Sequence, residues 1–383
     1  MQFKEITGQT EIKQRLTEMV RSGRIPHAMM FLGPEGNGSL PLALATAQYV
    51  QCENRNENDS CGSCASCTKN QKFIHPDLHF TFPVVPKKSG EPPVSADYIT
   101  EWRAALASNP YMNANDWLQS IEAENRQGNI TVRECHDIIR RLSLKTYESG
   151  FKIEIIWLAE FLKDAGNILL KIIEEPPVDT IFILVVENIE LVLTTVISRT
   201  QLIRINAMPD EDVKNGLLQR FEMDENTAKK IARIAEGNFN AALTMVDGQE
   251  NENDKQLRRW LGYCFNLKLK PSTANTQNLM EWVEETAKMG REKQKIFLRY
   301  ALFFLRECSL ILLTGQPEKL EGEELKFAQG LCSRLEPDQL EVLSRLFNQL
   351  FYHIERNGNP KILFLSNSFK IASVFKKEEV EID

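Results

Sequence analysis

The stretch "HAMMFLGPEGNGSL", residues 27–40, contains residue types that bind nucleotide phosphates. It follows the spacing of a phosphate-binding loop, G-x-x-x-x-G-K-[ST], through three glycines: Gly33, Gly36 and Gly38. In such a loop the lysine neutralises phosphate oxygens, and the next hydroxyl binds magnesium. Ser39 and Leu40 occupy those two positions here. The pattern therefore predicts the backbone of a nucleotide site without the groups that hold a nucleotide, although an ordinary glycine-rich turn would have the same glycines.

A second group with chemical potential is a cluster of four cysteines, spaced C-x8-C-x2-C-x2-C: Cys52, Cys61, Cys64 and Cys67. Overlapping C-x-x-C turns place thiolates on one side of a tight loop, and four thiolates without an open position suit a structural zinc ion. An iron–sulfur cluster is the main alternative, but its motif expects a further cysteine followed by proline. Disulfides are the third possibility. The sequence therefore predicts one structural Zn²⁺.

Composition limits the class of protein. The chain has 383 residues, a formal net charge of −7 and 42% hydrophobic residues, which is typical of a globular protein of two or three domains. The polar, charged start argues against a secretory signal, and the most apolar run, "YALFFLRECSLILLTG", contains two charged residues. We therefore expect no membrane span, a cytoplasmic location, and cysteines that are reduced or bound to metal.

The first half of the chain alternates short apolar runs with amphipathic helices, which predicts a parallel sheet covered on both faces. The expected strands are residues 28–33, 78–84, 152–158, 180–186 and 201–205. From about residue 208 the pattern is entirely helical, with a polar linker expected at 247–256. The fold class is thus α/β plus all-α. We expect an α/β domain over 1–206 that includes the cysteine segment 52–67 and a helical insertion 86–129, then a small helical domain over 207–250 and a helical bundle over 255–383.

Other segments carry a family resemblance. Residues 167–200 contain "NILLKIIEEPP" and end in Ser198-Arg199-Thr200, and "HPD" lies at 75–77. With the cysteine cluster and "AEGNFNAALTMV" at 235–246, they closely resemble the AAA+ subunits of bacterial DNA polymerase III sliding-clamp loaders. The resemblance covers about the first 250 residues well and the C-terminal bundle loosely. It implies a RecA-like AAA+ domain with a zinc knuckle, a helical lid and a C-terminal oligomerisation (collar) domain.

The resemblance also shows which ATPase residues are replaced. Ser39 and Leu40 stand for the phosphate lysine and the magnesium hydroxyl, and Trp157-Leu158 stand where the family has an Asp-Glu pair. Asn240 replaces the lid arginine. Four losses in one site imply a non-catalytic member that holds the ring together, binds no nucleotide and has no ATPase activity of its own. The alternatives are an active gamma/tau-like ATPase with unusual motifs, or a zinc-bearing nucleic-acid-binding module.

One charged group of the family's site is retained. Arg199 matches the arginine that reaches the γ-phosphate bound by a neighbouring subunit, which implies an arginine finger supplied in trans. Thr200 departs from the family's cysteine at the next position. The alternative is a solvated arginine at a strand end. Glu174 to Pro177 terminate a helix, and the family implies that they have an inter-subunit role as well.

The resemblance also implies partners. They are the gamma/tau and delta subunits of the loader, and in the complex the sliding clamp and primer-template DNA, within a holoenzyme whose overall activity is DNA-directed DNA polymerase. A basic helix could face phosphates or only solvent through four residues: Arg133, Arg140, Arg141 and Lys145. The insertion 86–129 is either satellite packing around Trp102 and Trp117 or a surface for a partner.

Overall fold

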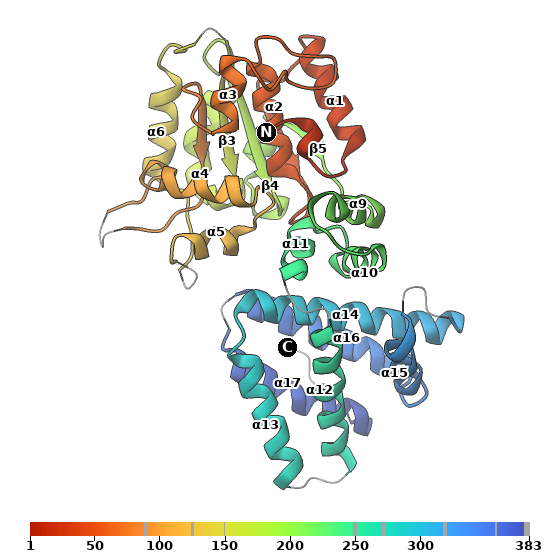
Figure 1. Ribbon diagram of the computed structural model, residues 1–383. Coiled ribbons are helices and arrows are strands. Elements are labelled where there is room, and N and C mark those ends of the chain that lie inside the picture. Colours follow the sequence, from red (N-terminus) through yellow and green to blue (C-terminus); the bar gives the residue numbers. More distant parts are fainter. Residues whose placement is uncertain are drawn as a thin grey trace. The chain divides into compact units, whose positions relative to one another are not determined.

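The computed structural model describes residues 1–87, 91–123, 126–148, 150–247, 251–269, 273–316, 320–356 and 358–378 (Figure 1). The chain forms two compact units. The first comprises Met1–Ala232 and Glu236–Ala242, and the second comprises Arg233–Ala235 and the chain from Leu243 onward. The expected three-domain division stays a prediction. In the described part of the chain, every helix is too short or too polar to cross a membrane.

The first unit is built on a parallel sheet of five strands in the order β2-β3-β4-β1-β5. The strands are β1 (Ala28–Leu32), β2 (Leu78–Thr81), β3 (Lys152–Trp157), β4 (Thr180–Val186) and β5 (Gln201–Arg204). All five lie where the apolar runs predict them, and the α/β plus all-α fold class is confirmed. Residues 82–84 are an exception. They leave the sheet after Thr81, because the Phe82 amide donates to Ser95 Oγ and Val84 pairs with Asn129.

The central strands β1, β3 and β4 are buried on both faces because helices cover both sides of the sheet. Met30 pairs in register with Leu184 of β4 and Leu202 of β5. Met30 and Leu184 belong to a buried core with α6, η3, α7 and α8. Since successive strand residues point to opposite faces, Phe31 faces the other side. Helix α2 packs against β1, β3 and β4.

The helices of this unit vary widely in length. The α-helices are α1 (Thr10–Arg21), α2 (Ser39–Gln51), α3 (Ala65–Gln71), α4 (Ile99–Ser108), α5 (Ala114–Ser120), α6 (Val132–Leu142), α7 (Leu170–Glu174), α8 (Thr194–Ile197), α9 (Asp210–Arg220), α10 (Glu225–Ala235, ending in the second unit) and α11 (Phe239–Asp247, likewise). The 3-10 helices are η1 (Phe3–Glu5), η2 (Ser95–Tyr98), η3 (Ala159–Leu169) and η4 (Ile189–Leu191).

The insertion 86–129 packs an aromatic cluster against the sheet. Trp102 of α4 stacks on Phe82 at 4.1 Å and lies 5.1 Å from Trp157, at the end of β3. Trp117 of α5 meets Trp102 edge-on at 5.1 Å, and its indole N–H donates to the Pro83 carbonyl at 2.7 Å. Both insertion tryptophans are therefore core residues, as the packing interpretation expects.

The second unit is helical. It contains α12 (Asn251–Leu269), α13 (Thr273–Ala287), α14 (Arg291–Thr314), α15 (Gly322–Cys332), α16 (Pro337–Glu355) and α17 (Pro360–Lys376). Trp260 lies stacked between Trp282 at 5.0 Å and Phe347 at 5.1 Å, and its indole N–H donates to Ser368 Oγ. The linker prediction is wrong at one end. Residues 251–256 form the first turns of α12, and residues 248–250 of the predicted linker lie outside the described residues.

Candidate functional site

The glycine-rich loop joins β1, inside the sheet, to the start of α2, where a phosphate-binding loop would lie. Gly36 has a φ of +70°, a conformation that side chains other than glycine rarely adopt. A Cβ on Gly33 would lie 1.9 Å from Asn37 Nδ2, and one on Gly36 would lie 1.9 Å from Asn238 Oδ1. The glycines are thus required by the chain's own side chains, which pack directly against the loop.

Asn37 occupies the inside of the loop. Its Nδ2 donates to the Ile205 carbonyl at 2.7 Å, just after β5. Its Oδ1 accepts from the Ser39 amide at 3.0 Å and from Ser39 Oγ at 2.7 Å. Ser39 and Leu40 are both buried. An amide and a hydroxyl at the start of α2, groups suited to binding a phosphate, are therefore already bonded to a side chain of the same loop.

Glu35 connects the loop to two distant segments. Its Oε1 accepts from Asn113 Nδ2 at 3.1 Å and from Asn238 Nδ2 at 3.0 Å. Asn113 comes from the insertion, and Asn238 precedes α11. The Phe239 amide also donates to the Gly36 carbonyl at 2.9 Å. A carboxylate therefore lies in the loop, where its charge would repel a triphosphate.

Tyr111 of the insertion covers the other end of the loop. Its hydroxyl accepts from the Thr7 amide at 2.9 Å, and its ring meets Phe239 at a centroid distance of 4.8 Å. A Cβ on Gly38 would lie 3.5 Å from this ring. Gln9 Nε2 adds a bond to the Asn37 carbonyl at 2.9 Å. The N-terminal segment, the insertion and the start of α11 thus close around the loop.

Asn240, which the family resemblance matches to a lid arginine, is buried, and both its oxygen and its nitrogen are hydrogen-bonded. Its Oδ1 accepts from Asn109 Nδ2 at 2.6 Å, and its Nδ2 donates to Asp116 Oδ2 at 2.6 Å. The side chain thus links the start of α11 to the insertion. A longer, charged arginine has no equivalent role in this arrangement.

Replacing Asn240 with alanine is expected to destabilise the first unit by about 1–3 kcal/mol, because partly buried partners lose their hydrogen bonds. Urea unfolding measures the loss, and hydrogen exchange of residues 33–40 locates it. Asn226→Ala, at an exposed position of α10, is the matched control and should change neither result. Equal stability of the two variants would contradict a structural role for Asn240.

The end of β3 carries no acidic pair. Trp157 and Leu158, which the family resemblance matches to an Asp-Glu pair, are both buried. Glu160 is buried too, and its Oε1 accepts from the amides of Glu187 and Asn188 at 3.0 and 3.2 Å. Burial raises the pKa of Glu160, and the backbone N–H groups oppose this rise. Its carboxyl group therefore braces the turn after β4.

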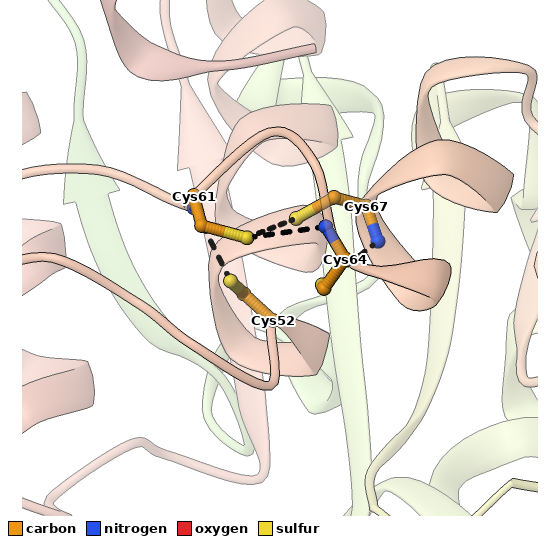
Figure 2. Close-up of side chains that lie close together, drawn as sticks. All are labelled: Cys52, Cys61, Cys64 and Cys67. Atoms are coloured by element: carbon orange, nitrogen blue, oxygen red, sulfur yellow. Dashed lines mark hydrogen bonds between the residues drawn. The ribbon is translucent and has the colours of Figure 1, made fainter.

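The four cysteines of the knuckle converge, and their sulfur atoms all lie within 4.8 Å of one another (Figure 2). The sulfurs of Cys61 and Cys67 are 3.9 Å apart, much further than the roughly 2.05 Å of a disulfide. Four sulfurs about 2.3 Å from one central zinc ion would lie about 3.8 Å apart. The cluster can therefore hold a metal ion in a tetrahedral shell.

Backbone groups around the cluster also suit a metal. The amides of Cys61 and Cys64 donate to the sulfurs of Cys52 and Cys61, both at 3.3 Å, and the Cys67 amide donates to the sulfur of Cys64 at 3.4 Å. Hydrogen bonds from the amides of Ser63 and Cys64 lower the pKa of Cys61 to about 6. Burial raises the pKa of Cys67. A cation would stabilise the thiolates together.

The knuckle also holds the N-terminal segment. Asp59 accepts from the amides of Phe3 and Lys4, both at 3.0 Å, and Gln2 Nε2 donates to the Ser60 carbonyl at 2.6 Å. These residues directly precede Cys61 in the loop. Residues 2–7 thus connect the cysteine loop to the glycine-rich loop. The Thr7 amide at their end donates to Tyr111, which covers the glycine-rich loop.

Arg199 lies just after α8, with its side chain about one-third exposed (32%). Its Nε donates to Glu174 Oε2 at 2.7 Å, and a terminal nitrogen donates to the Thr195 carbonyl at 3.1 Å. About 57% of the Glu174 side chain is exposed, so the ion pair lies at the surface. Part of the Arg199 side chain is therefore exposed to solvent.

The basic helix does not present one continuous stripe. Arg141 points into the protein, where it bonds Glu154 through two nitrogens and Glu134 at 3.2 Å. Burial lowers the pKa of Arg141, but these two carboxylates outweigh that effect and raise it. Arg140 is exposed and pairs with Asp137 at 2.8 Å. The sequence interpretation misplaced Arg141, because the packing of α6 against β3 brings Arg141 beside the buried carboxylate of Glu154.

Several residues of this region are absent from the sequence-based site. They are Glu35, Asn37, Tyr111 and Asn113, which close the phosphate loop, and Asp59, which holds the N-terminal segment. The unusual "EGNG" inside the loop was the available signal for Glu35 and Asn37, since both lie where a nucleotide would contact the loop.

A family model that covers more than half of the chain shows its family. A family model described as "DNA polymerase III, delta subunit" matches residues 8–209. DNA polymerase III subunit gamma of Buchnera aphidicola is 23% identical, covering 94% of this chain and 91% of the relative. Subunit delta' of Escherichia coli is 25% identical, covering 65% and 63%. A solved gamma subunit-related protein of Thermotoga maritima aligns over 96% of this chain and 99% of its own, at 14% identity and a TM-score of 0.39.

Proposed function

Since the chain belongs to the DNA polymerase III, delta subunit family, we propose that it is the non-catalytic, delta-prime-like subunit of a clamp loader. In this role it helps to load the sliding clamp onto primed DNA, and it supplies Arg199 to the ATP site of a neighbouring subunit. The coarser conclusion, that the chain is a clamp-loader subunit of DNA polymerase III, is common to all the relatives described above.

The observation that carries the choice of subunit is the phosphate loop closed by the chain itself. Relatives named gamma and delta' match at similar identity, so overall similarity does not separate them. Asn37 instead binds the amide and hydroxyl of Ser39, and the Glu35 carboxylate lies in the loop. These contacts support a subunit that has exchanged nucleotide binding for internal contacts.

The partners of this proposal are the gamma/tau and delta subunits, with the clamp and primer-template DNA in the assembled complex and a cytoplasmic location. The proposed cofactor is one structural zinc ion held by the four-cysteine knuckle. The zinc would fix the loop 52–67 and supply no chemistry, because a shell of four thiolates leaves no position for water. Hydrogen bonds of the chain itself hold the loop 52–67 against Gln2 and Lys4.

The isolated protein is expected to bind neither ATP nor ADP in the presence of magnesium. The loop has no lysine and no free hydroxyl to offset the charge of the phosphates, and Glu35 adds a negative charge. Isothermal titration calorimetry with the ATP-binding subunit of the same complex as positive control tests this. Micromolar affinity for ATP would instead favour the alternative function, an active gamma/tau-like ATPase with unusual motifs.

A further inference from the structure

We propose that Glu174 is a positioning residue that orients the guanidinium of Arg199 towards the nucleotide of the neighbouring subunit. The inference rests on the proposed function, since it requires that Arg199 acts as a finger. Glu174, the first glutamate of the Glu-Glu-Pro-Pro segment, thereby has a specific task. The end of a helix does not by itself require charged side chains.

The contacts leave the arginine fork available. A guanidinium has five N–H donors in one plane. Arg199 uses its Nε–H for Glu174 and one terminal N–H for the Thr195 carbonyl. These are the only side-chain hydrogen bonds of Arg199 within the described residues. Three N–H donors on its two terminal nitrogens are therefore not used. Those nitrogens form the edge that binds phosphate oxygens in pairs.

The fold determines where both partners of the pair lie. Glu174 is the last residue of α7, and Pro176 and Pro177 prevent the helix from continuing beyond it. The residue before it, Ile173, is buried in the same core as Val196 of α8. Arg199 follows α8, and its amide donates to the Val196 carbonyl at 3.1 Å. The backbones that carry Glu174 and Arg199 are therefore anchored in one core.

The expected contribution is moderate because the pair is exposed. Double-mutant cycles on exposed ion pairs give small energies, equivalent to an effect of up to about five-fold. The pair would act by restricting the rotamers of a long side chain before a partner binds, so that less freedom is lost on assembly. We therefore expect removal of Glu174 to weaken the action of Arg199 without abolishing it.

The test is a double-mutant cycle in the reconstituted clamp loader, measuring clamp- and DNA-stimulated ATP hydrolysis. Glu174→Ala is expected to lower the rate about two- to five-fold. In an Arg199→Ala background the same substitution should have no further effect, since the side chain that it orients is gone. A merely structural role of Glu174 would lower the rate in both backgrounds. Glu18→Ala, at an exposed glutamate of α1 in the same unit, is the matched control and should match the wild type.

The outcomes separate the two proposals. If Arg199→Ala leaves the rate unchanged in a complex of normal composition, the proposed finger is wrong. If Arg199→Ala lowers the rate and Glu174→Ala equals the wild type, only the positioning role is wrong. A rate above the wild type for Glu174→Ala would mean that the glutamate withholds the arginine, and this too overturns the positioning role. Equal melting temperatures of the isolated variants establish that each one folds.

Discussion

Arg199→Ala is expected to slow clamp- and DNA-stimulated ATP hydrolysis by the reconstituted complex while leaving the fold and metal content of this chain unchanged. An arginine finger contributes about 10³–10⁵ in turnover at the site that it serves. The measured loss for the whole complex should be smaller, because the other ATP sites retain their own arginines. Arg199→Lys should not restore the rate, since an ammonium cannot span two phosphate oxygens as the planar guanidinium does.

The structure offers a matched control for this experiment. Arg204, at the end of β5, is also an exposed arginine of the same unit, and Arg204→Ala removes the same charge. The control should retain the wild-type rate. Assembly of each complex is checked by size-exclusion chromatography. If the two alanine variants hydrolyse ATP at equal rates, Arg199 is a surface arginine and the proposed subunit interface is misplaced.

Loss of the metal is expected to have the largest effect on stability. One zinc ion per chain should be found by elemental analysis, and Cys61→Ser should abolish its binding. In zinc-finger peptides, structural zinc binding has an apparent free energy of about 10–16 kcal/mol, and much of it is folding free energy. Here the loop is part of a larger unit, so we expect local unfolding with a lower melting temperature.

Hydrogen exchange can locate this unfolding. Asp59 and Ser60 hold Phe3, Lys4 and Gln2, so removal of the metal should raise exchange in residues 52–71 and also in residues 2–7. Asn58→Ala, at an exposed position of the same loop, is the matched control, because it keeps all four thiols. Iron with acid-labile sulfide in the purified protein would contradict the zinc assignment. Unchanged exchange in residues 2–7 of the Cys61→Ser variant would contradict the link to the N-terminal segment.

Much of this protein could be predicted from local features of the sequence. The central strands β1 and β4 were predictable because a strand buried on both faces needs an unbroken apolar run. The cysteine cluster was predictable because its four members lie within 16 residues of chain, Cys52 to Cys67, and a short loop allows few arrangements. The missing lysine and hydroxyl of the phosphate loop are visible directly as Ser39 and Leu40.

Only the tertiary structure decided what replaces the nucleotide and where the charged side chains point. Asn240 bonds Asn109 and Asp116 across 131 and 124 residues of chain, and no local pattern encodes a contact between such distant polar side chains. The sequence also could not place Arg141 inside the protein beside Glu154, or Arg199 beside Glu174, because each pair joins side chains of different elements. Apolar periodicity reports which face of an element is buried, whereas the partner of a polar group is determined by the packing of whole elements.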